Sequence, residues 1–298
     1  MDIRENEALA PFTSFHIGGI ARFFCEAKTP KDVMEAVGWA KTKSVPLFIL
    51  GGGTNILMGD GGFHGLVMKL NLRDMKIARE TICAGSGVPW MALLEKAAEA
   101  SLAGLEWGAG IPGTVGGALR GNAGAYGHSI GEYVESVDAI STATGTRKIF
   151  TREESGFSYR SSFFKKHPEY IITEAVLRLT PGDRKTLEAK MAEIVSIRNG
   201  KLPSEPSAGS VFKNIELAGN PVGEILARIT DATGVEREQW LKYGKIPAGW
   251  LIEHCGLKGK KIGGAQISEK HANTIVNTGN ARAEDVIMLA SLIKQKVR

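Results

Sequence analysis

Two glycine-rich stretches constrain this 298-residue chain more than any other feature of its sequence. The first, GGGTNIL at residues 51–57, follows the apolar run 47–50, and the second, residues 108–127, contains eight glycines. Glycine allows the backbone to approach a ligand closely and to turn several N–H groups toward an anion. Either stretch alone could be a set of tight turns or a barrel bend, but two of them favour a backbone cradle for a pyrophosphate.

Two common nucleotide-binding folds are disfavoured. A nicotinamide-binding Rossmann domain needs the motif G-x-G-x-x-G to run from a strand into a helix; neither stretch is interpreted as that motif, and the first opens no obvious helix. No lysine stands at the spacing of a P-loop in either stretch. The residues therefore predict a bound dinucleotide without selecting which one.

The net charge is mildly positive, +5, from 37 basic and 32 acidic residues. The strongest basic runs, at 165–166 and 258–261, are interpreted as solvated faces, with attraction of an anionic ligand as the alternative. Aromatic residues make up 7% of the chain and do not alternate with basic ones. Nucleic acid binding is therefore not expected.

Cysteine and histidine show no pattern typical of a disulfide framework or a metal site. Cys25, Cys83 and Cys255 are widely spaced, and neither C-x-x-C nor H-E-x-x-H occurs. Free thiols are typical of a reducing compartment. The N-terminal residues are acidic and polar, unlike those of a signal peptide. No apolar run approaches the roughly 20 residues that span a bilayer. We expect a cytoplasmic protein without a metal ion or membrane insertion.

Hydrophobic periodicity and capping residues predict a mixture of helices and strands. Thr29 and Pro30 suit the start of a helix that ends near Pro46, and the run 47–50 suits a buried strand of a βαβ-like unit. The other expected elements are a helix over 89–100 stopped near Gly104, a hairpin of 137–140 with 147–150, a strand over 170–179, a helix over 187–197, a helix begun and capped at Asn220-Pro221, and a helix over 282–298. The turn-forming residues 199–207 predict a linker, which places the main domain boundary after Arg198.

Two further segments carry groups suited to catalysis. Residues 159–165 (YRSSFFK) contain Arg160, whose planar guanidinium is a natural partner for a carboxylate or enolate, although most single arginines are surface residues. Residues 207–214 (SAGSVFKN) place the Ser210 hydroxyl after Gly209 and ahead of a lysine and an amide. This second segment could equally be a turn that enters a strand.

Taken together, the motifs resemble those of the UDP-N-acetylenolpyruvoylglucosamine reductase family, flavoenzymes of bacterial cell-wall precursor synthesis, in its shorter subgroup. The matching segments run from about residue 11 to 290 and include TSFHIGG at 13–19, GGGTNIL, GLEWGAGIPGTVGGALRGNAGAYG at 104–127, SYRSSFFK, SAGSVFKN and GLKGKKIGGAQISEKHANTIVN at 256–277. The resemblance implies an α+β, two-subdomain FAD-binding fold of the vanillyl-alcohol-oxidase (PCMH) type. The subdomains are placed at 1–66 and 67–198, followed by an α+β substrate domain at 199–298.

The resemblance also implies the cofactor and its site. FAD is the expected bound cofactor, with its pyrophosphate along the two glycine stretches and Arg198 near a flavin phosphate. The implied FAD-binding residues are Gly51, Gly52, Gly53, Thr54, Asn55, Ile56, Ile111, Pro112, Gly113, Thr114, Gly116, Gly117 and Arg198.

The implied reaction is ping-pong, with NADPH as the first substrate and a UDP-sugar as the second. NADPH reduces FAD and leaves; a hydride then passes to carbon 3 of the enolpyruvyl ether of UDP-N-acetylglucosamine, and carbon 2 is protonated. Arg160 is expected to hold the substrate carboxylate and stabilise the developing charge, and Ser210 to give the proton. Tyr159, Lys201, Lys213 and Asn214 match positions that contact substrate or the UDP phosphates.

The sequence departs from the family in two places. The family's third catalytic residue is a glutamate in a strand after the last helix, whereas this sequence ends at Arg298, so FAD binding is expected and full turnover is not. Arg282 stands where the family has a helix-capping threonine. An oxidase of another substrate on the same scaffold, which SAGSVFKN argues against, and a non-catalytic anion-binding protein are the alternatives; a monomer is favoured.

Overall fold

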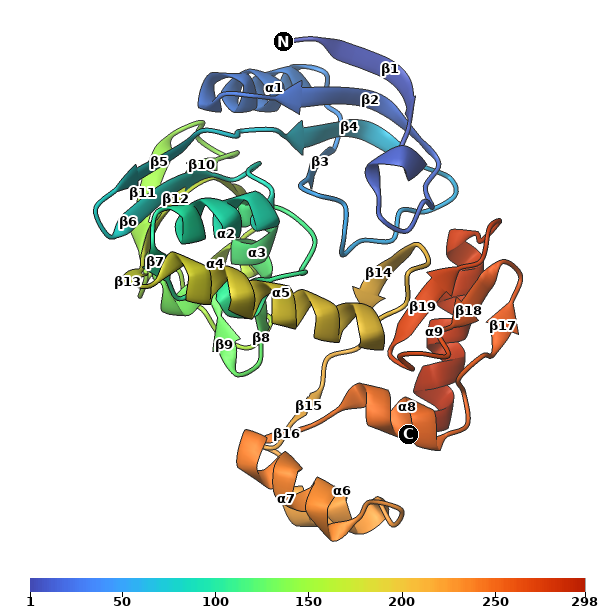
Figure 1. The fold of residues 1–298 in the computed structure, drawn as a ribbon. Helices are drawn as coiled ribbons and strands as arrows, with labels where there is room; N and C mark the ends of the chain where they lie inside the picture. The colour runs from blue at the N-terminus through green and yellow to red at the C-terminus, as the bar shows by residue number, and fades with distance from the viewer. Residues whose placement is uncertain (298) are drawn as a thin grey trace.

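The N-terminal part of the chain forms a four-stranded sheet covered by one helix (Figure 1). The computed structural model describes residues 1–297, and in this part it contains β1 (Ile3–Ala8), a 3-10 turn (Ala10–Phe12), β2 (Ile20–Ala27), α1 (Pro30–Thr42), β3 (Leu47–Leu50) and β4 (Phe63–Leu70). The strand order is β1-β2-β4-β3, with β2 and β3 both parallel to β4. The expected βαβ-like unit is confirmed, with β4 inserted between its two strands. The boundary expected after residue 66 falls inside β4.

Helix α1 begins where its capping residues predict. Thr29 Oγ1 accepts the Asp32 N–H at 3.2 Å, and Asp32 accepts the Thr29 N–H at 2.9 Å, so each side chain satisfies an end group of the other. Val33, Ala36, Val37 and Ala40 form its buried face and pack with Cys25, Leu66 and Met68 of the sheet.

The middle of the chain forms a five-stranded antiparallel sheet in the order β11-β10-β12-β6-β5. Its strands are β5 (Met75–Ala78), β6 (Thr81–Gly85), β10 (Val134–Ser141), β11 (Arg147–Thr151) and β12 (Tyr170–Arg178), and its helices are α2 (Trp90–Glu99), α3 (Val115–Gly121), α4 (Phe163–Lys166) and α5 (Arg184–Lys201). The expected hairpin of 137–140 with 147–150 and the strand over 170–179 are confirmed. Minor pairs join β7 (Leu102–Ala103) to β13 (Thr180–Pro181) and β8 (Gly124–Ala125) to β9 (His128–Ser129).

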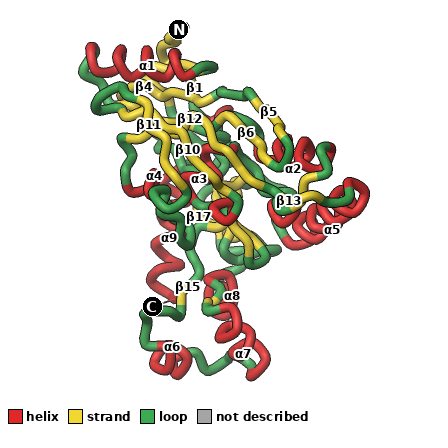
Figure 2. The backbone as a smooth tube through the Cα atoms, turned by 90° about the vertical axis from the view of Figure 1, so that its left-hand side faces the viewer, coloured by secondary structure: helices red, strands yellow, loops and turns green. Residues whose placement is uncertain are grey.

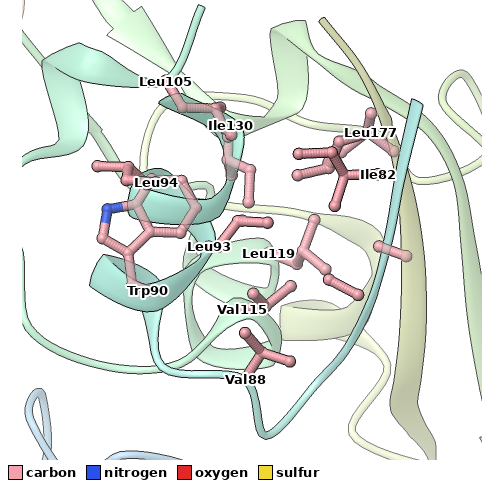
Figure 3. Packing of buried hydrophobic residues seen from close by; sticks show 14 of the residues in the cluster. Ile82, Val88, Trp90, Leu93, Leu94, Leu105, Val115, Leu119, Ile130 and Leu177 are labelled. Carbon is pink, nitrogen blue, oxygen red and sulfur yellow. The ribbon is translucent and has the colours of Figure 1, made fainter. Parts of the chain in front are cut away.

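The largest core lies between this sheet and α2 and α3 (Figure 3). Leu93 of α2 and Leu119 of α3 meet Ile82 and Leu177 of the sheet there, and all four side chains are fully buried. On the opposite face, Ile140 and Ile171 join the cluster beneath α1. Both faces of the sheet are therefore covered, and the first two parts of the chain share a core.

The stops of two helices differ from expectation. Helix α2 covers the expected range to within one residue at each end, but Ser101, in the left-handed conformation (φ +56°), follows its C-cap and stops it in place of Gly104. Helix α5 runs to Lys201, past the boundary expected after Arg198, so the predicted linker 199–207 begins as helix. Pro203 provides the actual stop, since the residue before a proline avoids the helical conformation.

The C-terminal part is a second α+β unit with a helical insertion. Its sheet has the order β14-β19-β18-β17, and its elements are β14 (Ser207–Ser210), β15 (Ile215–Glu216), α6 (Val222–Arg228), α7 (Gly234–Tyr243), β16 (Lys245–Ile246), α8 (Ala248–His254), β17 (Lys261–Ile262), β18 (Ala265–Ile267), β19 (Thr274–Asn277) and α9 (Ala283–Val297). Figures 1 and 2 show α6 and α7 at the end of the molecule farthest from α1. The expected cap of α6 is wrong, because the Asn220 amide donates to Glu216 O and gives the helix no side-chain cap. Of the last expected helix, residue 298 lies outside the described residues.

The C-terminal part is anchored to the N-terminal part. Phe15 and Ile17 are buried in the C-terminal core, beside Leu289 and Ile293 of α9. Asp60 accepts the N–H groups of residues 283 and 284 at 3.0 and 3.3 Å, and so caps α9 from another part of the chain. No helix within residues 1–297 is both long and apolar enough to cross a bilayer.

Candidate active site

The two glycine-rich stretches, far apart in sequence, lie against each other. A Cβ atom on Gly52 would lie 2.9 Å from Gly113 Cα, closer than two carbon atoms normally approach. Thr54 Oγ1 donates a hydrogen bond to Pro112 O at 3.3 Å across the same junction. The N-terminal and middle parts of the chain therefore present one continuous backbone surface, formed by the residues predicted to hold one pyrophosphate.

The first loop can be built only with glycine at its centre. Gly53 has φ +65°, and a Cβ there would lie 1.9 Å from Phe12 O. Its carbonyl accepts the Ser14 N–H at 3.1 Å. Of the other predicted residues, Asn55 is exposed, whereas Ile56 packs partly into the core of the first sheet.

The second loop leads into α3, a helix that the sequence analysis did not predict. The interpretation that neither stretch contains G-x-G-x-x-G is wrong, because residues 108–113 have that spacing. A 3-10 turn (Glu106–Gly108) leads into them instead of a strand, so the Rossmann context is absent. The Ile111 N–H donates to Gly108 O at 3.0 Å and the Gly116 N–H to Ser86 O at 2.9 Å. The N–H groups of these two predicted cofactor-binding residues are therefore already bound within the protein and are not free to donate to a ligand. A Cβ on Gly116 would also meet Ser86 Cβ at 2.7 Å, so this glycine is required by packing.

Several buried polar atoms in or beside the second loop have no hydrogen-bond partner within residues 1–297. Among them are Thr114 Oγ1, at the start of α3, and Arg198 Nε, on α5. The Arg198 side chain lies along the loop, with its Cδ 3.1 Å from the position of a Cβ on Gly110. Buried polar groups are nearly always satisfied in native proteins, and a phosphate could accept from both groups. The residues present therefore fit a bound dinucleotide.

Arg160 stands at the tip of a two-residue turn. Ser158 and Ser161 exchange both backbone hydrogen bonds at 3.0 Å, and Arg160 has φ +52°, in the left-handed region. Its Nη2 donates to Gly124 O at 2.8 Å, which uses one of its five N–H groups. Within residues 1–297 the half-buried guanidinium has no other hydrogen-bond acceptor, so a planar anion could take the remaining donors.

The same turn meets the C-terminal part of the chain. Tyr159 Oη accepts the Asn214 N–H at 3.3 Å, and Asn214 Oδ1 accepts the Ala248 N–H at 3.1 Å. Lys245 Nζ lies 3.5 Å from the centroid of the Tyr159 ring, in cation–π contact. Two residues predicted to bind substrate, Tyr159 and Asn214, are thus in contact across 55 residues of sequence.

Ser210 ends the edge strand β14, where it pairs with Thr274 of β19. It is exposed, and its hydroxyl has no hydrogen-bond partner in the described part of the chain. Gly209 has φ +73°, which turns the strand just before this hydroxyl. Ser210 and Arg160 share no hydrogen bond, so any joint action needs a ligand between them.

Cations gather around the Arg160 turn. The pKa of Lys165 is lowered by burial and then by the positive charges of Lys213, Arg120 and Arg160. None of these four forms an ion pair with a carboxylate within residues 1–297. A concentration of unpaired cations is suited to a phosphate-bearing or carboxylate-bearing ligand. The predicted Lys201 is exposed at the end of α5 and makes no such contact.

Three residues of this region were not predicted from the sequence. Lys165 was interpreted as part of a solvated run, and Arg120 and Lys245 were not singled out at all. The signal for Lys165 was its place in the SYRSSFFK motif, five residues after Arg160. No local pattern marks Lys245, because its position depends on the helical insertion. Among residues 1–297, no group of three or more His, Cys, Asp or Glu side chains is placed to hold a metal ion.

The class of the protein follows from this architecture and its sequence matches. A family model described as "FAD binding domain" matches residues 21–150, which contain both glycine loops. Together with the two joined sheets, this makes the chain an FAD-dependent oxidoreductase with an α+β FAD-binding domain. The expected fold class and the expected cofactor are confirmed.

Matches over nearly the whole chain identify the family. The C-terminal domain of UDP-N-acetylenolpyruvoylglucosamine reductase matches residues 201–298. The enzyme of that name from Solibacter usitatus is 36% identical over 97% of this chain and 90% of its own length, and that from Lactobacillus gasseri is 37% identical over 100% and 90%. The crystal structure of the Thermus caldophilus enzyme superposes with a TM-score of 0.78 at 31% identity, covering 99% of this chain and 96% of that one. The chain belongs to the UDP-N-acetylenolpyruvoylglucosamine reductase family, as its motifs indicated.

Proposed function

We propose that Arg160 and Ser210 act on the enolpyruvyl group when this chain reduces the enolpyruvyl ether of UDP-N-acetylglucosamine to UDP-N-acetylmuramate. As a family member, the chain is an FAD-dependent reductase of peptidoglycan precursor synthesis that uses NADPH. When bound at the two glycine loops, FAD would supply the hydride transfer from NADPH to the enolpyruvyl group. The Arg160 guanidinium, fixed by one hydrogen bond to Gly124 O with its other donors unpaired, is the observation that supports these roles.

Arg160 stabilises the charge that hydride addition creates. A hydride added at carbon 3 leaves an electron pair on carbon 2, which is delocalised into the adjacent carboxylate. The guanidinium can donate two parallel hydrogen bonds to that carboxylate. These bonds strengthen as charge develops, and removal of such a donor typically costs about 10²–10³ in rate.

Ser210 completes the reduction by protonating carbon 2. A serine hydroxyl is a weak acid, but a carbanion-like carbon is a strong base and takes its proton readily. The exposed Ser210 hydroxyl, without a partner in the described chain, is available for this transfer. The hydride and this proton together add two hydrogen atoms across the double bond, and the serine regains its proton from solvent.

The remaining predicted residues bind the two nucleotides. Tyr159 and Asn214 stand together beside the unpaired cations, and we assign them with Lys213 and Lys201 to the UDP-sugar. The two glycine loops, with Thr114 and Arg198, are assigned to the FAD pyrophosphate. This arrangement leaves the enolpyruvyl group near the Arg160 turn.

Separate measurement of the two half-reactions tests the proposal. Ser210→Ala should leave reduction of the bound flavin by NADPH intact and slow its reoxidation by the enolpyruvyl substrate by about 10²–10⁴. Ser204→Ala, an exposed serine of the preceding loop, is the matched control. Equal slowing of both half-reactions would remove Ser210 from the role of proton donor.

We further propose a cytoplasmic monomer. The substrate is a nucleotide sugar of cell-wall precursor synthesis, and the three cysteines are unpaired, as in a reducing compartment. Residues from the middle and C-terminal parts of one chain meet at Tyr159 and Asn214, so the site needs no second copy. Sedimentation of the flavin-loaded protein at one chain mass would support this; a stable dimer would contradict it.

A further inference from the structure

Helix α4 places a lysine against the backbone of the Arg160 turn. Lys165 Nζ donates a hydrogen bond to Arg160 O at 2.9 Å. We propose that Lys165 is a positioning residue, which fixes the Arg160 peptide so that the guanidinium points at the substrate carboxylate. This inference rests on the proposed role of Arg160.

Each end of the turn is anchored independently, whereas at its tip the Arg160 guanidinium is held by Gly124 O and the Arg160 carbonyl by Lys165. Asn122 Nδ2 donates to Ser158 O at 2.9 Å before the turn, and Ser162 Oγ donates to Arg120 O at 2.8 Å after it. Arg160 lies between these anchors in the left-handed conformation, which is disfavoured for a residue with a side chain. In the described part of the chain, Lys165 is the hydrogen-bond donor to the Arg160 carbonyl. Removal of this bond frees the peptide whose orientation directs the guanidinium.

The hydrogen bond to Arg160 O distinguishes Lys165 from the other lysine of this helix. Lys165 is exposed and forms no ion pair within residues 1–297, so no carboxylate holds its ammonium elsewhere. Partial burial and then the positive charges of Lys213, Arg120 and Arg160 lower its pKa. The next residue, Lys166, is likewise exposed on the same short helix but has no such bond within residues 1–297, which makes it a matched control.

A positioning role affects one step of the reaction and not the other. A misplacement of about 1 Å can cost roughly 10²-fold in rate, and a turn that remains anchored at both ends should shift less. We therefore expect Lys165→Met to lower the limiting rate of flavin reoxidation by about 10-fold. The half-saturating concentration of the enolpyruvyl substrate, the rate of reduction by NADPH, the flavin content and the melting temperature should match those of Lys166→Met. Lys165→Arg, which keeps a charged donor, should restore most of the rate.

A double-variant cycle tests whether Lys165 acts through Arg160. Arg160→Lys removes the planar fork, and adding Lys165→Met should then slow reoxidation by much less than 10-fold, because the residue being positioned is gone. Multiplying effects would overturn the inference. So would a raised half-saturating concentration at an unchanged limiting rate, which would mean direct anion binding, or equal slowing of both half-reactions.

The two proposals can fail separately. Normal reoxidation by Arg160→Lys would refute the proposed role of Arg160. If Arg160→Lys is slow while Lys165→Met behaves like Lys166→Met, then only the positioning role of Lys165 is refuted.

Discussion

The contact between the two glycine loops can be tested by adding one methyl group. In Gly52→Ala, the new Cβ would lie 2.9 Å from Gly113 Cα and 3.2 Å from Gly113 C. Carbon atoms prefer a separation of about 3.5–4.0 Å, so the loops must part by roughly 0.6–1 Å. Gly52 is exposed and its φ is not in the left-handed region, so the backbone itself can accept alanine. The substitution therefore perturbs the spacing of the loops and little else.

The size of the effect follows from what the loops hold. If both contribute hydrogen bonds to one pyrophosphate, a shift of this size breaks or stretches one of them. A hydrogen bond to a charged group contributes about 1.5–3 kcal/mol, and each 1.4 kcal/mol is about tenfold in affinity. Gly52→Ala should therefore weaken FAD binding by about 10- to 100-fold.

Titration of the flavin-free protein with FAD, followed by quenching of flavin fluorescence, measures this change. Gly61→Ala is the control, because a Cβ there meets nothing within 4 Å and its φ is likewise compatible with alanine. The two flavin-free variants should melt at similar temperatures. If Gly52→Ala binds FAD as tightly as Gly61→Ala, the two loops do not share the pyrophosphate and the assignment of the cradle is wrong.

Two further predictions concern stability. Asp60→Ala removes the acceptor for the first N–H groups of α9 and should lower the free energy of unfolding by about 1 kcal/mol, which corresponds to a fall in melting temperature of about 2–4 °C. Arg282→Ala, which removes an exposed ion pair with Asp60 at 3.9 Å, should change the stability little. Equal losses of stability in the two variants would refute the capping role. Burial, and then the positive charge of Lys258, hold the pKa of His271 below its usual 6.5. The unfolded chain therefore binds the proton more readily than the folded chain, and the stability of the fold should decrease as the pH drops through 6.5. His271→Gln should flatten that fall in urea unfolding between about pH 7.5 and 5, and an unchanged slope would contradict this.

Elements with strong local signals were predictable. The capping box at Thr29 and Asp32 sets the start of α1, and the turn-forming residues 143–146 set the hairpin of β10 and β11. The end of α5 was misplaced because Asn199 and Gly200, which form turns elsewhere, extend a helix whose stop is Pro203. Turn propensity is weak compared with an existing helix that can add one more hydrogen-bonded turn.

The candidate site was predictable as a set of segments but not as a geometry. Glycine density indicated a cradle, yet it could not reveal that the Gly116 N–H is bound by Ser86 and so unavailable to a ligand. That bond joins residues 30 positions apart, and no local pattern encodes it. Lys165 is exposed, as its interpretation as a solvated lysine predicts, but its hydrogen bond to Arg160 O at 2.9 Å has no signal in the sequence.

Ser14 connects the first cofactor loop to the strand that carries Ser210. The Ser14 N–H donates to Gly53 O of the cofactor loop at 3.1 Å, and its hydroxyl donates to Ser207 O of β14 at 2.7 Å. The Ser207 N–H returns a bond to Ser14 O at 3.1 Å. Ser210 is three residues further along β14, so these contacts tie the start of its strand to the first cofactor loop. The burial of Phe15 and Ile17 in the C-terminal core reinforces this link. The N-terminal part therefore carries both the first cofactor loop and the backbone contacts that hold the strand bearing Ser210.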